Sequence, residues 1–247
     1  MDRLIYTAMT GANAAASRQA VLSNNLANVS TNGFRAQLAT YRAVPLRGEG
    51  ATTRVFAVES TAGHSDKPGP AMRTDRSLDA MAVGNAWFGV QGLDGTEAYT
   101  RNGHFEISQD GTLTSGNGLP VLSSDGSPIA VPAGAQLSIG NDGGISAKVG
   151  NQPANTIGRL KLVTPNNPED PLKRGDDGLF RALSGDPIEN DATARVQVGV
   201  LEGSNVNIIE AMVGMIQTAR QFETQMRLLQ TAESNDRSAG QLLGLQG

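Results

Sequence analysis

One end of the fold is decided by the stretch NIIEAMVGMIQTARQFETQMRLL, residues 207–229. Its larger apolar side chains alternate spacings of four and three residues over three heptads, which is the pattern of a coiled-coil seam. Asn207 and Glu210 fit an Asn-started capping box, so we predict a helix that begins near Asn207 and runs to about Arg237. The predicted seam consists of Ile208, Met212, Met215, Ala219, Phe222, Met226 and Leu229.

The other end of the chain also has the pattern of a helix, although its composition is unusual. Between residues 4 and 34 the only charged residue is Arg18, and Ala, Asn, Ser and Thr dominate. Apolar positions recur mostly at spacings of three and four, which predicts a helix with one buried stripe. Asn32 and Gly33 are predicted to end it, because both residues tolerate the left-handed conformation. The predicted stripe consists of Ile5, Met9, Ala12, Ala16, Leu22 and Leu26.

The middle of the chain is rich in strand-forming residues. Asp-Gly recurs at 94–95, 110–111, 125–126, 142–143 and 177–178, between short runs of Val, Ile, Leu, Thr, Tyr and Phe. Because Asp-Gly between such runs is a strong hairpin signal, we predict an antiparallel sheet, sandwich or irregular barrel.

These patterns together predict an α+β fold. The N- and C-terminal helices pair as a coiled-coil-like layer, and the central domain is antiparallel and all-β. The predicted segments are an N-terminal helix over 1–34, an extended connector with a short hairpin over 35–85, a β domain over 86–201 and a C-terminal helix over 202–247.

Composition excludes several classes of protein. The net charge of −4, from 24 acidic and 20 basic residues in no long run, argues against a nucleic-acid or anionic-membrane partner. The absence of Cys excludes disulfides and thiolate chemistry. Asp2, Tyr6 and Thr7 interrupt the apolar core that a secretory signal needs, so we expect residues 1–16 to be retained. No apolar run approaches the length of a membrane span.

The terminal helices need more than one packing partner. Gly11 costs about 1 kcal/mol relative to Ala, and few charged i,i+4 pairs offset this. A helix without a charged face is expected to be covered on several sides. The simplest partner of the C-terminal seam is the N-terminal helix, with neighbouring copies covering the remainder. The alternative is a self-contained helical hairpin whose polar, uncharged face contacts water.

The sequence resembles a known family over nearly its whole length. NNLANVSTNGFRA (24–36) and LEGSNVNIIEAMVGMIQTARQFETQMRLLQTAE (201–233) resemble the paired terminal signatures of the bacterial flagellar rod and hook proteins. WFGVQGLDGTEAYTRNGHFEISQDGTLTSGNGLPVL (87–122) resembles the opening of the β domain in the same family. The segments MDRLIYTAMTGA, RGDDGLFR and QLLGLQG are most similar to members from the proximal part of the rod, with distal rod members as the alternative.

The resemblance implies a structural subunit of the flagellar basal body, in the rod that spans the periplasm. Such a subunit leaves the cytoplasm through the flagellar type III export apparatus without a cleaved signal peptide. It then assembles with copies of itself and with other rod proteins. In the family's motifs the apolar residues pack and the amides bond neighbouring backbones, and we expect Asn24, Asn28 and Asn205 to act in assembly contacts. The expected interface comprises Ile5, Met9, Ala12, Ala16, Leu22, Asn24, Asn25, Leu26, Asn28, Gly33, Phe34, Asn205, Asn207, Ile208, Met212, Met215, Ala219, Phe222, Met226 and Leu229.

An enzyme or glycan-binding protein is the competing class, and a coiled-coil adaptor is a third. His64 and His104 belong to no catalytic motif, and the Asp-Gly pairs lack EF-hand spacing, so turns explain them better than calcium sites or glycosidase carboxylates do. The row of Met212, Met215 and Met226 is typical of helix packing rather than of a metal or haem site. Trp87 and Phe88 are expected to anchor the β core; the alternative is an aromatic platform for carbohydrate. We therefore expect no catalytic residue, cofactor, metal or small-molecule substrate.

Overall fold

A computed structural model describes residues 2–45 and 55–244, and contains two helices and sixteen strands in those ranges. The predicted segments therefore extend outside the described residues at residue 1, at 46–54 and at 245–247. The chain divides into two compact units, each of which is described separately below. Unit 1 comprises residues 1–29, 36–65 and 206–247, and unit 2 comprises 30–35 and 66–205.

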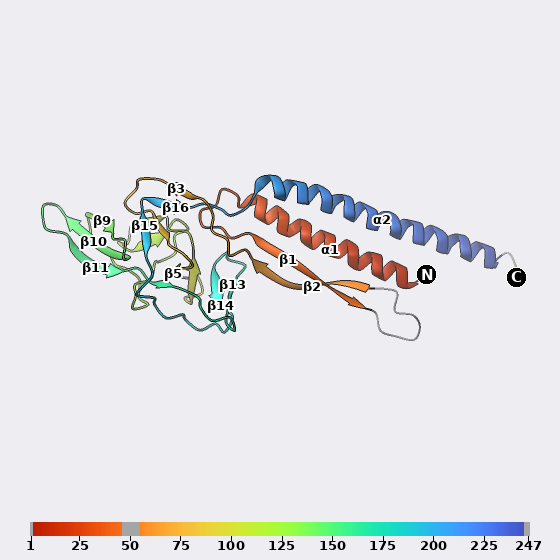
Figure 1. Ribbon diagram of the computed structural model, residues 1–247, viewed down its shortest axis with the longest axis horizontal. Coiled ribbons are helices and arrows are strands. Elements are labelled where there is room, and N and C mark those ends of the chain that lie inside the picture. Colours follow the sequence, from red (N-terminus) through yellow and green to blue (C-terminus); the bar gives the residue numbers. More distant parts are fainter. Residues whose placement is uncertain (1, 46–54, 245–247) are drawn as a thin grey trace. The chain divides into compact units, whose positions relative to one another are not determined.

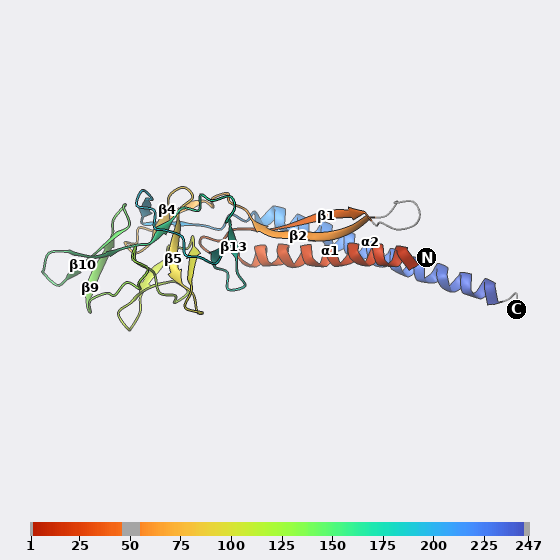
Figure 2. The same cartoon turned by 90° about the horizontal axis from the view of Figure 1, so that it is seen from below.

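Unit 1 consists of two helices and one β-hairpin. Helix α1 (Asp2–Ala27) lies beside α2 (Ile208–Gly244) (Figure 1). Strands β1 (Gln37–Pro45) and β2 (Val55–His64) form an antiparallel pair with a bulge at Thr40/Tyr41, and the pair packs against α1 (Figure 2). The predicted terminal helices are confirmed, and strands β1 and β2 lie in the segment predicted as an extended connector with a short hairpin.

Helix α1 ends earlier than the sequence predicts. The last helical residue is Ala27, and not Asn32 or Gly33. The Asn28 N–H donates to both Asn24 O and Asn25 O at 3.2 Å, which closes the final turn, and residues 28–33 then form turns. Gly33 does adopt the left-handed conformation, with φ +70°, but it lies in unit 2. Helix α2 continues beyond the predicted end at Arg237, to Gly244.

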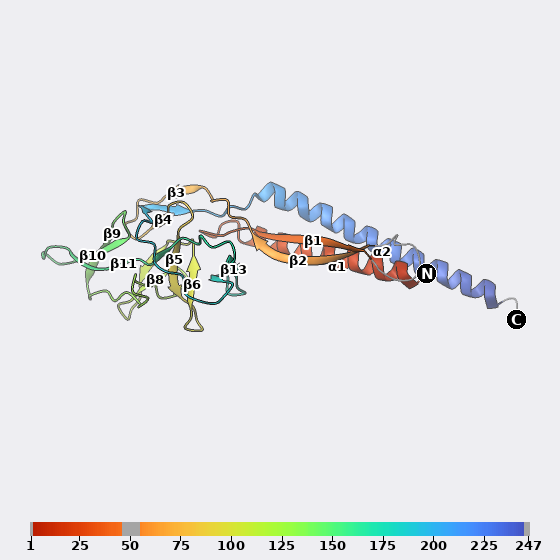
Figure 3. The same ribbon diagram turned by 60° about the horizontal axis from the view of Figure 1, so that its bottom comes forward.

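Unit 2 is an assembly of short antiparallel strands joined by tight turns (Figure 3). A five-stranded sheet has the order β12-β5-β6-β14-β13, and a three-stranded sheet has the order β11-β10-β9. Three two-stranded ladders, β7-β8, β15-β4 and β16-β3, are the other pairings between the described strands of unit 2. The central antiparallel β domain of the predicted α+β fold is thus confirmed.

The strands of unit 2 are short. In chain order they are β3 (Ala71–Arg73), β4 (Ala80–Ala82), β5 (Trp87–Gln91), β6 (Glu97–Thr100), β7 (Phe105–Ile107), β8 (Leu113–Ser115), β9 (Ala135–Ile139), β10 (Gly144–Val149), β11 (Asn155–Arg159), β12 (Leu162–Val163), β13 (Leu172–Arg174), β14 (Phe180–Ala182), β15 (Val196–Val198) and β16 (Val200–Glu202).

All five Asp-Gly pairs form the predicted turns. Their glycines have φ between +74° and +82°, a region that glycine enters without a steric cost. In the turn between β5 and β6, the Gly92 N–H donates to Thr96 O at 2.8 Å and the Gly95 N–H donates to Gly92 O at 2.9 Å. The Asp94 carboxylate also accepts from the Thr96 N–H and hydroxyl, which explains the preference for Asp in such turns.

Two apolar clusters form the core of unit 2. The larger is centred on Phe88, which is fully buried and meets Phe105 edge to face at 5.2 Å between ring centroids. The smaller contains Trp87, which packs against Phe180 at 4.6 Å. The prediction that Trp87 and Phe88 anchor the core is confirmed, and the burial of Trp87 is incompatible with its use as a carbohydrate platform.

Candidate functional site

Small residues form the contact face of α1. Ala8, Ala12 and Ala15 are buried at spacings of four and three, against α2 and the hairpin. Of the predicted stripe, Ala12 lies on this face and Ile5, Leu22 and Leu26 are half-buried. Met9 and Ala16 are exposed, and therefore do not belong to the buried stripe.

The face of α2 that packs on α1 coincides only in part with the predicted seam. The buried residues of α2 are Ala211, Thr218 and Ala232, whereas Met212 and Met226 of the predicted seam are exposed. Small side chains allow two helices to approach closely, and this stripe repeats at the same heptad spacing as the larger apolar residues, offset by one position. Periodicity alone cannot separate two such registers. Of the other seam residues, Ile208, Ala219 and Phe222 are exposed, and Met215 and Leu229 are half-buried.

The first turns of α2 are apolar on both sides. Ile209 is 74% exposed, Val213 47% and Ile216 55%. At 100° per residue these three side chains project from the side of the helix opposite Ala211 and Thr218. From Arg220 onward that side carries polar and charged residues. We call Ile209, Met212, Val213 and Ile216 the outer patch of α2.

The asparagines of the N-terminal motif bond to their own chain. Asn25 is buried, and its amide makes two hydrogen bonds to the backbone of Gln37 at the start of β1: Nδ2 donates to Gln37 O at 3.0 Å and Oδ1 accepts from Gln37 N at 2.8 Å. The Asn28 side chain donates to Asn24 O at 2.8 Å. The assembly role of Asn24 and Asn28 stays a prediction, while Asn25 holds the hairpin to α1.

Asn207 caps α2 as predicted. Its Oδ1 accepts from the N–H groups of Ile209 at 3.0 Å and Glu210 at 3.3 Å, which satisfies two backbone donors that a helix start leaves free. Glu210 lies in the first turn, where a negative charge is favourable.

Gly33, Phe34 and Asn205 have structural contacts within unit 2. The Gly33 N–H donates to Glu202 O at 2.7 Å, and Phe34 is buried with the guanidinium of Arg174 4.6 Å from its ring centroid. The Asn205 N–H donates to Phe34 O at 3.2 Å. Their predicted assembly role remains a prediction, and their local contacts show how the two terminal motifs meet inside one unit.

A buried ionic cluster, which no sequence pattern predicted, lies beside these residues. Arg35, Arg101 and Glu202 are 1–2% exposed, and each arginine makes an ion pair with Glu202. A charged residue in an otherwise ordinary loop gives no sign that it is buried, because its partner lies far away in the sequence. The sequence feature that could have indicated the cluster is the arginine directly after the motif NGF.

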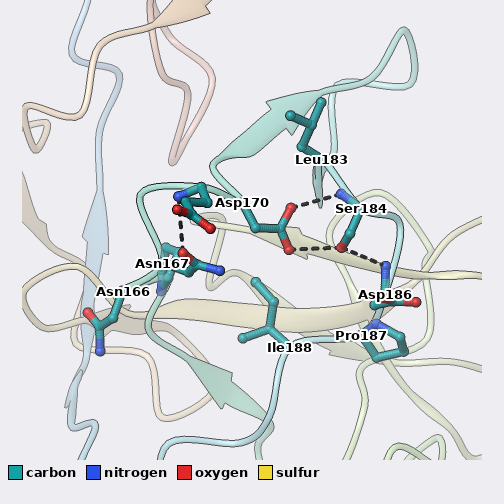
Figure 4. A pocket seen from close by; sticks show the side chains of 10 residues that line it. Asn166, Asn167, Asp170, Leu183, Ser184, Asp186, Pro187 and Ile188 are labelled. Atoms are coloured by element: carbon teal, nitrogen blue, oxygen red, sulfur yellow. Dashed lines mark hydrogen bonds between the residues drawn. The ribbon is translucent and has the colours of Figure 1, made fainter.

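A cavity of about 550 Å³ in unit 2 lies between residues 165–170 and 183–188 (Figure 4). Ser184 donates to the Asp170 carboxylate through both its N–H and its hydroxyl, each at 2.8 Å. These hydrogen bonds hold the pKa of Asp170 below its ordinary value. A glycosidase general acid requires the opposite shift in pKa.

The two histidines have structural surroundings. His104 Nδ1 lies 2.8 Å from Asp79 Oδ1, in a cluster that Arg76 also joins. His64 ends β2, where it pairs with Gln37 of β1. Within residues 2–45 and 55–244 there is no group of three or more possible metal-ligating residues. None of the described helices has the length and apolarity of a membrane span.

Three family models match the chain. The model described as "Flagella basal body rod protein" matches residues 5–35, and "Flagellar hook protein FlgE/F/G D1 domain" matches residues 81–147. The model "Flagellar basal body rod FlgEFG protein C-terminal" matches residues 197–242. The model of residues 5–35 covers most of α1, and the model of residues 197–242 covers the outer patch of α2.

Full-length relatives agree with these models. The flagellar basal-body rod protein FlgF of Escherichia coli is 46% identical over 254 residues, covering 99% of this chain and 100% of the relative. FlgF of Salmonella typhimurium is 44% identical, with the same coverage. The flagellar basal-body rod protein FlgG of Buchnera aphidicola is 31% identical, covering 96% of this chain and 98% of the relative. This chain therefore belongs to the flagellar basal-body rod protein family.

Proposed function

We propose that the chain is a structural subunit of the bacterial flagellar basal-body rod that polymerises through its terminal helices. The outer patch of α2 carries this proposal. A helix that is apolar all round is normally buried, yet Ile209, Val213 and Ile216 are exposed in the single chain. Sister subunits in the rod would cover these three side chains.

The pairing of the helices within one chain leaves much apolar surface uncovered. The contact face consists largely of alanines, which bury little area, while larger side chains such as Tyr6, Met9 and Leu228 remain about half exposed. Full burial of a large aliphatic side chain contributes about 1.5–3 kcal/mol. Assembly therefore adds a driving force that the single chain lacks.

The partners and place of the chain follow from this proposal. It assembles with copies of itself and with other rod proteins, in the part of the basal body that crosses the periplasm. The segments MDRLIYTAMTGA, RGDDGLFR and QLLGLQG, which resemble proximal rod members, support a proximal position, and a distal position is the second candidate. Export proceeds through the flagellar type III apparatus without a cleaved signal. The subunit acts in assembly and not as an enzyme, without cofactor, small-molecule substrate or nucleic acid.

The test replaces two residues of the outer patch with charged residues. Ile209→Asp together with Ile216→Asp is expected to abolish swimming and rod formation, because assembly would bury two carboxylates without partners. Both positions are exposed, so the thermal stability of the purified monomer should change by no more than about 1 kcal/mol. Gln217→Asp, at an exposed polar position of the same helix, is the control and should swim normally. Normal swimming of the double variant would refute the proposal.

A further inference from the structure

Four points of the chain mark the passages between the two units. They fall between residues 29 and 30, 35 and 36, 65 and 66, and 205 and 206. Three segments of unit 2 contain or border these points: 30–35, 66–70 and 200–205. Contacts that hold these segments together therefore also hold the points at which the chain passes from unit 2 to α1, to the hairpin and to α2.

A single carboxylate joins these three segments. Glu202 Oε1 accepts from Arg35 Nη2 at 2.9 Å and from the Gly69 N–H at 3.0 Å. Its other oxygen, Oε2, accepts from Arg101 Nε at 2.7 Å and from Arg101 Nη2 at 2.5 Å. Its backbone carbonyl accepts from the Gly33 N–H at 2.7 Å. Glu202 therefore bonds the first segment, the second segment and the body of unit 2 at the same time.

The two arginines extend the connections. Arg101 donates to the carbonyls of Gly84, Ala86 and Ala82, which anchors the cluster to the loop before β5 and to β4. Arg35 Nη1 donates to the carbonyls of Asp66 and Lys67. Both guanidinium groups lie over the ring of Trp87, at 5.8 Å for Arg35 and 5.7 Å for Arg101.

The backbone around the cluster permits no extra atom. A Cβ at Gly33 would lie 2.4 Å from the Arg101 carbonyl carbon, and a Cβ at Gly69 would lie 2.0 Å from Gly203 O. The Gly203 N–H donates to Pro70 O at 2.8 Å, and Asn205 Nδ2 donates to Lys67 O at 2.8 Å. The three segments thus touch each other directly as well as through the charges.

We propose that Arg35, Arg101 and Glu202 are positioning residues for assembly: they fasten together the three segments through which unit 2 connects to the helices and hairpin of unit 1. In every subunit the helices then begin from segments of unit 2 that are held together, whether or not the helices are ordered before incorporation. Buried charges that pair in one arrangement only suit this task, because any other arrangement leaves an unpaired charge. The inference rests on the proposed function for its assembly readout alone.

Amide exchange tests the fastening in the purified full-length chain. Glu202→Gln keeps the shape of the side chain but leaves two buried guanidinium groups without a counter-charge. We expect exchange at the amides of Gly33, Gly69, Gly203 and Asn205 to accelerate together by about a hundredfold, as the loss of a buried charge partner implies. The amides of Leu113 and Val121, which bond within the core, should be unchanged. Acceleration at Gly69 alone, or equally throughout unit 2, would overturn the proposal.

A second variant covers the case in which Glu202→Gln does not fold. Arg35→Lys keeps a positive charge near Glu202 but cannot bond Glu202, Asp66 and Lys67 together, and it should accelerate the same four amides to a smaller extent. Asp75→Asn, in an ion pair whose side chains are 72–80% exposed, is the control and should leave all four unchanged.

Measuring rod assembly distinguishes a positioning role of the ionic cluster from a merely stabilising one. We compare Glu202→Gln with a substitution of Ile145, in the core of unit 2, that lowers Tm by the same amount. The positioning role predicts that rods and swimming are lost with Glu202→Gln and retained with the Tm-matched Ile145 variant. Equal behaviour of the two variants would overturn it. If deleting the whole chain left rods intact, the proposed function would fail instead, independently of the exchange result.

Discussion

Gly33 occupies a position that only glycine fits. Its φ is +70°, and an added Cβ would lie 2.4 Å from the backbone of Arg101. We expect Gly33→Ala to destabilise unit 2 by more than about 3 kcal/mol, because left-handed strain and a backbone clash add up. Thermal unfolding of unit 2, followed by the fluorescence of Trp87, measures the change.

Gly118 provides the matched control for this prediction. Its φ is +77°, but a Cβ there would meet open space. Gly118→Ala should therefore cost only the conformational strain, about 1–2 kcal/mol. Equal costs at Gly33 and Gly118 would show that the close approach to Arg101 does not matter.

The stability of the folded chain depends on pH through the ionisation of Asp191. Hydrogen bonds from Thr193 and Thr164 lower the pKa of Asp191 to about 2, from an ordinary value near 4. Because the folded-state pKa is depressed, the contribution is fully present above the unfolded pKa and disappears as the pH falls through the folded pKa. Asp191→Asn should therefore lower Tm at pH 7, and the difference from the native chain should shrink below about pH 4 and disappear only below about pH 2.

The matched control for Asp191 is Asp110→Asn. Asp110 lies in an exposed hairpin turn, and among the described residues its carboxylate accepts no hydrogen bond. This variant should have the same Tm as the native chain at pH 7. A Tm difference for Asp191→Asn that is as large at pH 2 as at pH 7 would show that the loss is not caused by the charge.

At the scale of the elements, α1 offers a direct test of which side faces α2. Ala12 and Ala16 are one turn apart and both belong to the stripe predicted from sequence, but Ala12 is 5% exposed while Ala16 is exposed. Ala12→Leu should overpack the helix contact and destabilise unit 1 by about 1–3 kcal/mol. Ala16→Leu should change the stability of the single chain by less than about 0.5 kcal/mol.

Circular dichroism at the helix wavelength, followed on heating, would measure both alanine variants. A larger loss for Ala16→Leu than for Ala12→Leu would contradict the observed face of α1. The comparison is clean because the two substitutions have the same chemistry and the same helix propensity.

At the scale of the whole molecule, the two units should differ in protection. Unit 2 has fully buried residues such as Phe88, Phe105 and Ile145, whereas α2 buries mainly Ala and Thr and is exposed along most of its length. Hydrogen exchange on the purified monomer should therefore be fast in residues 2–27 and 208–244 and slow in the strands of unit 2. Uniform protection from end to end would argue that the single chain is already complete, against an assembly role for its helices.

Local patterns were sufficient to predict the elements of this chain. The Asp-Gly turns, the cap at Asn207 and the two terminal helices are encoded within a few neighbouring residues, because turn conformation and helix capping are short-range effects. The motifs that carry the family resemblance are equally local. The packing of the helices was harder to predict, because the buried residues Ala211 and Thr218 lie one position before Met212 and Ala219, and periodicity does not distinguish two registers offset by one residue.

Only the tertiary structure decided the contacts between distant segments. The pairing of β16 with β3 and the ionic cluster of Arg35, Arg101 and Glu202 join residues separated by a hundred positions or more. No periodicity or spacing encodes such a meeting, since its free energy depends on burial, on the loss of water and on a counter-charge that another part of the fold supplies. By itself the sequence determined the helices, the turns and the family; the folded chain determined which faces are covered and which charges are buried, because both depend on neighbours that are remote along the chain.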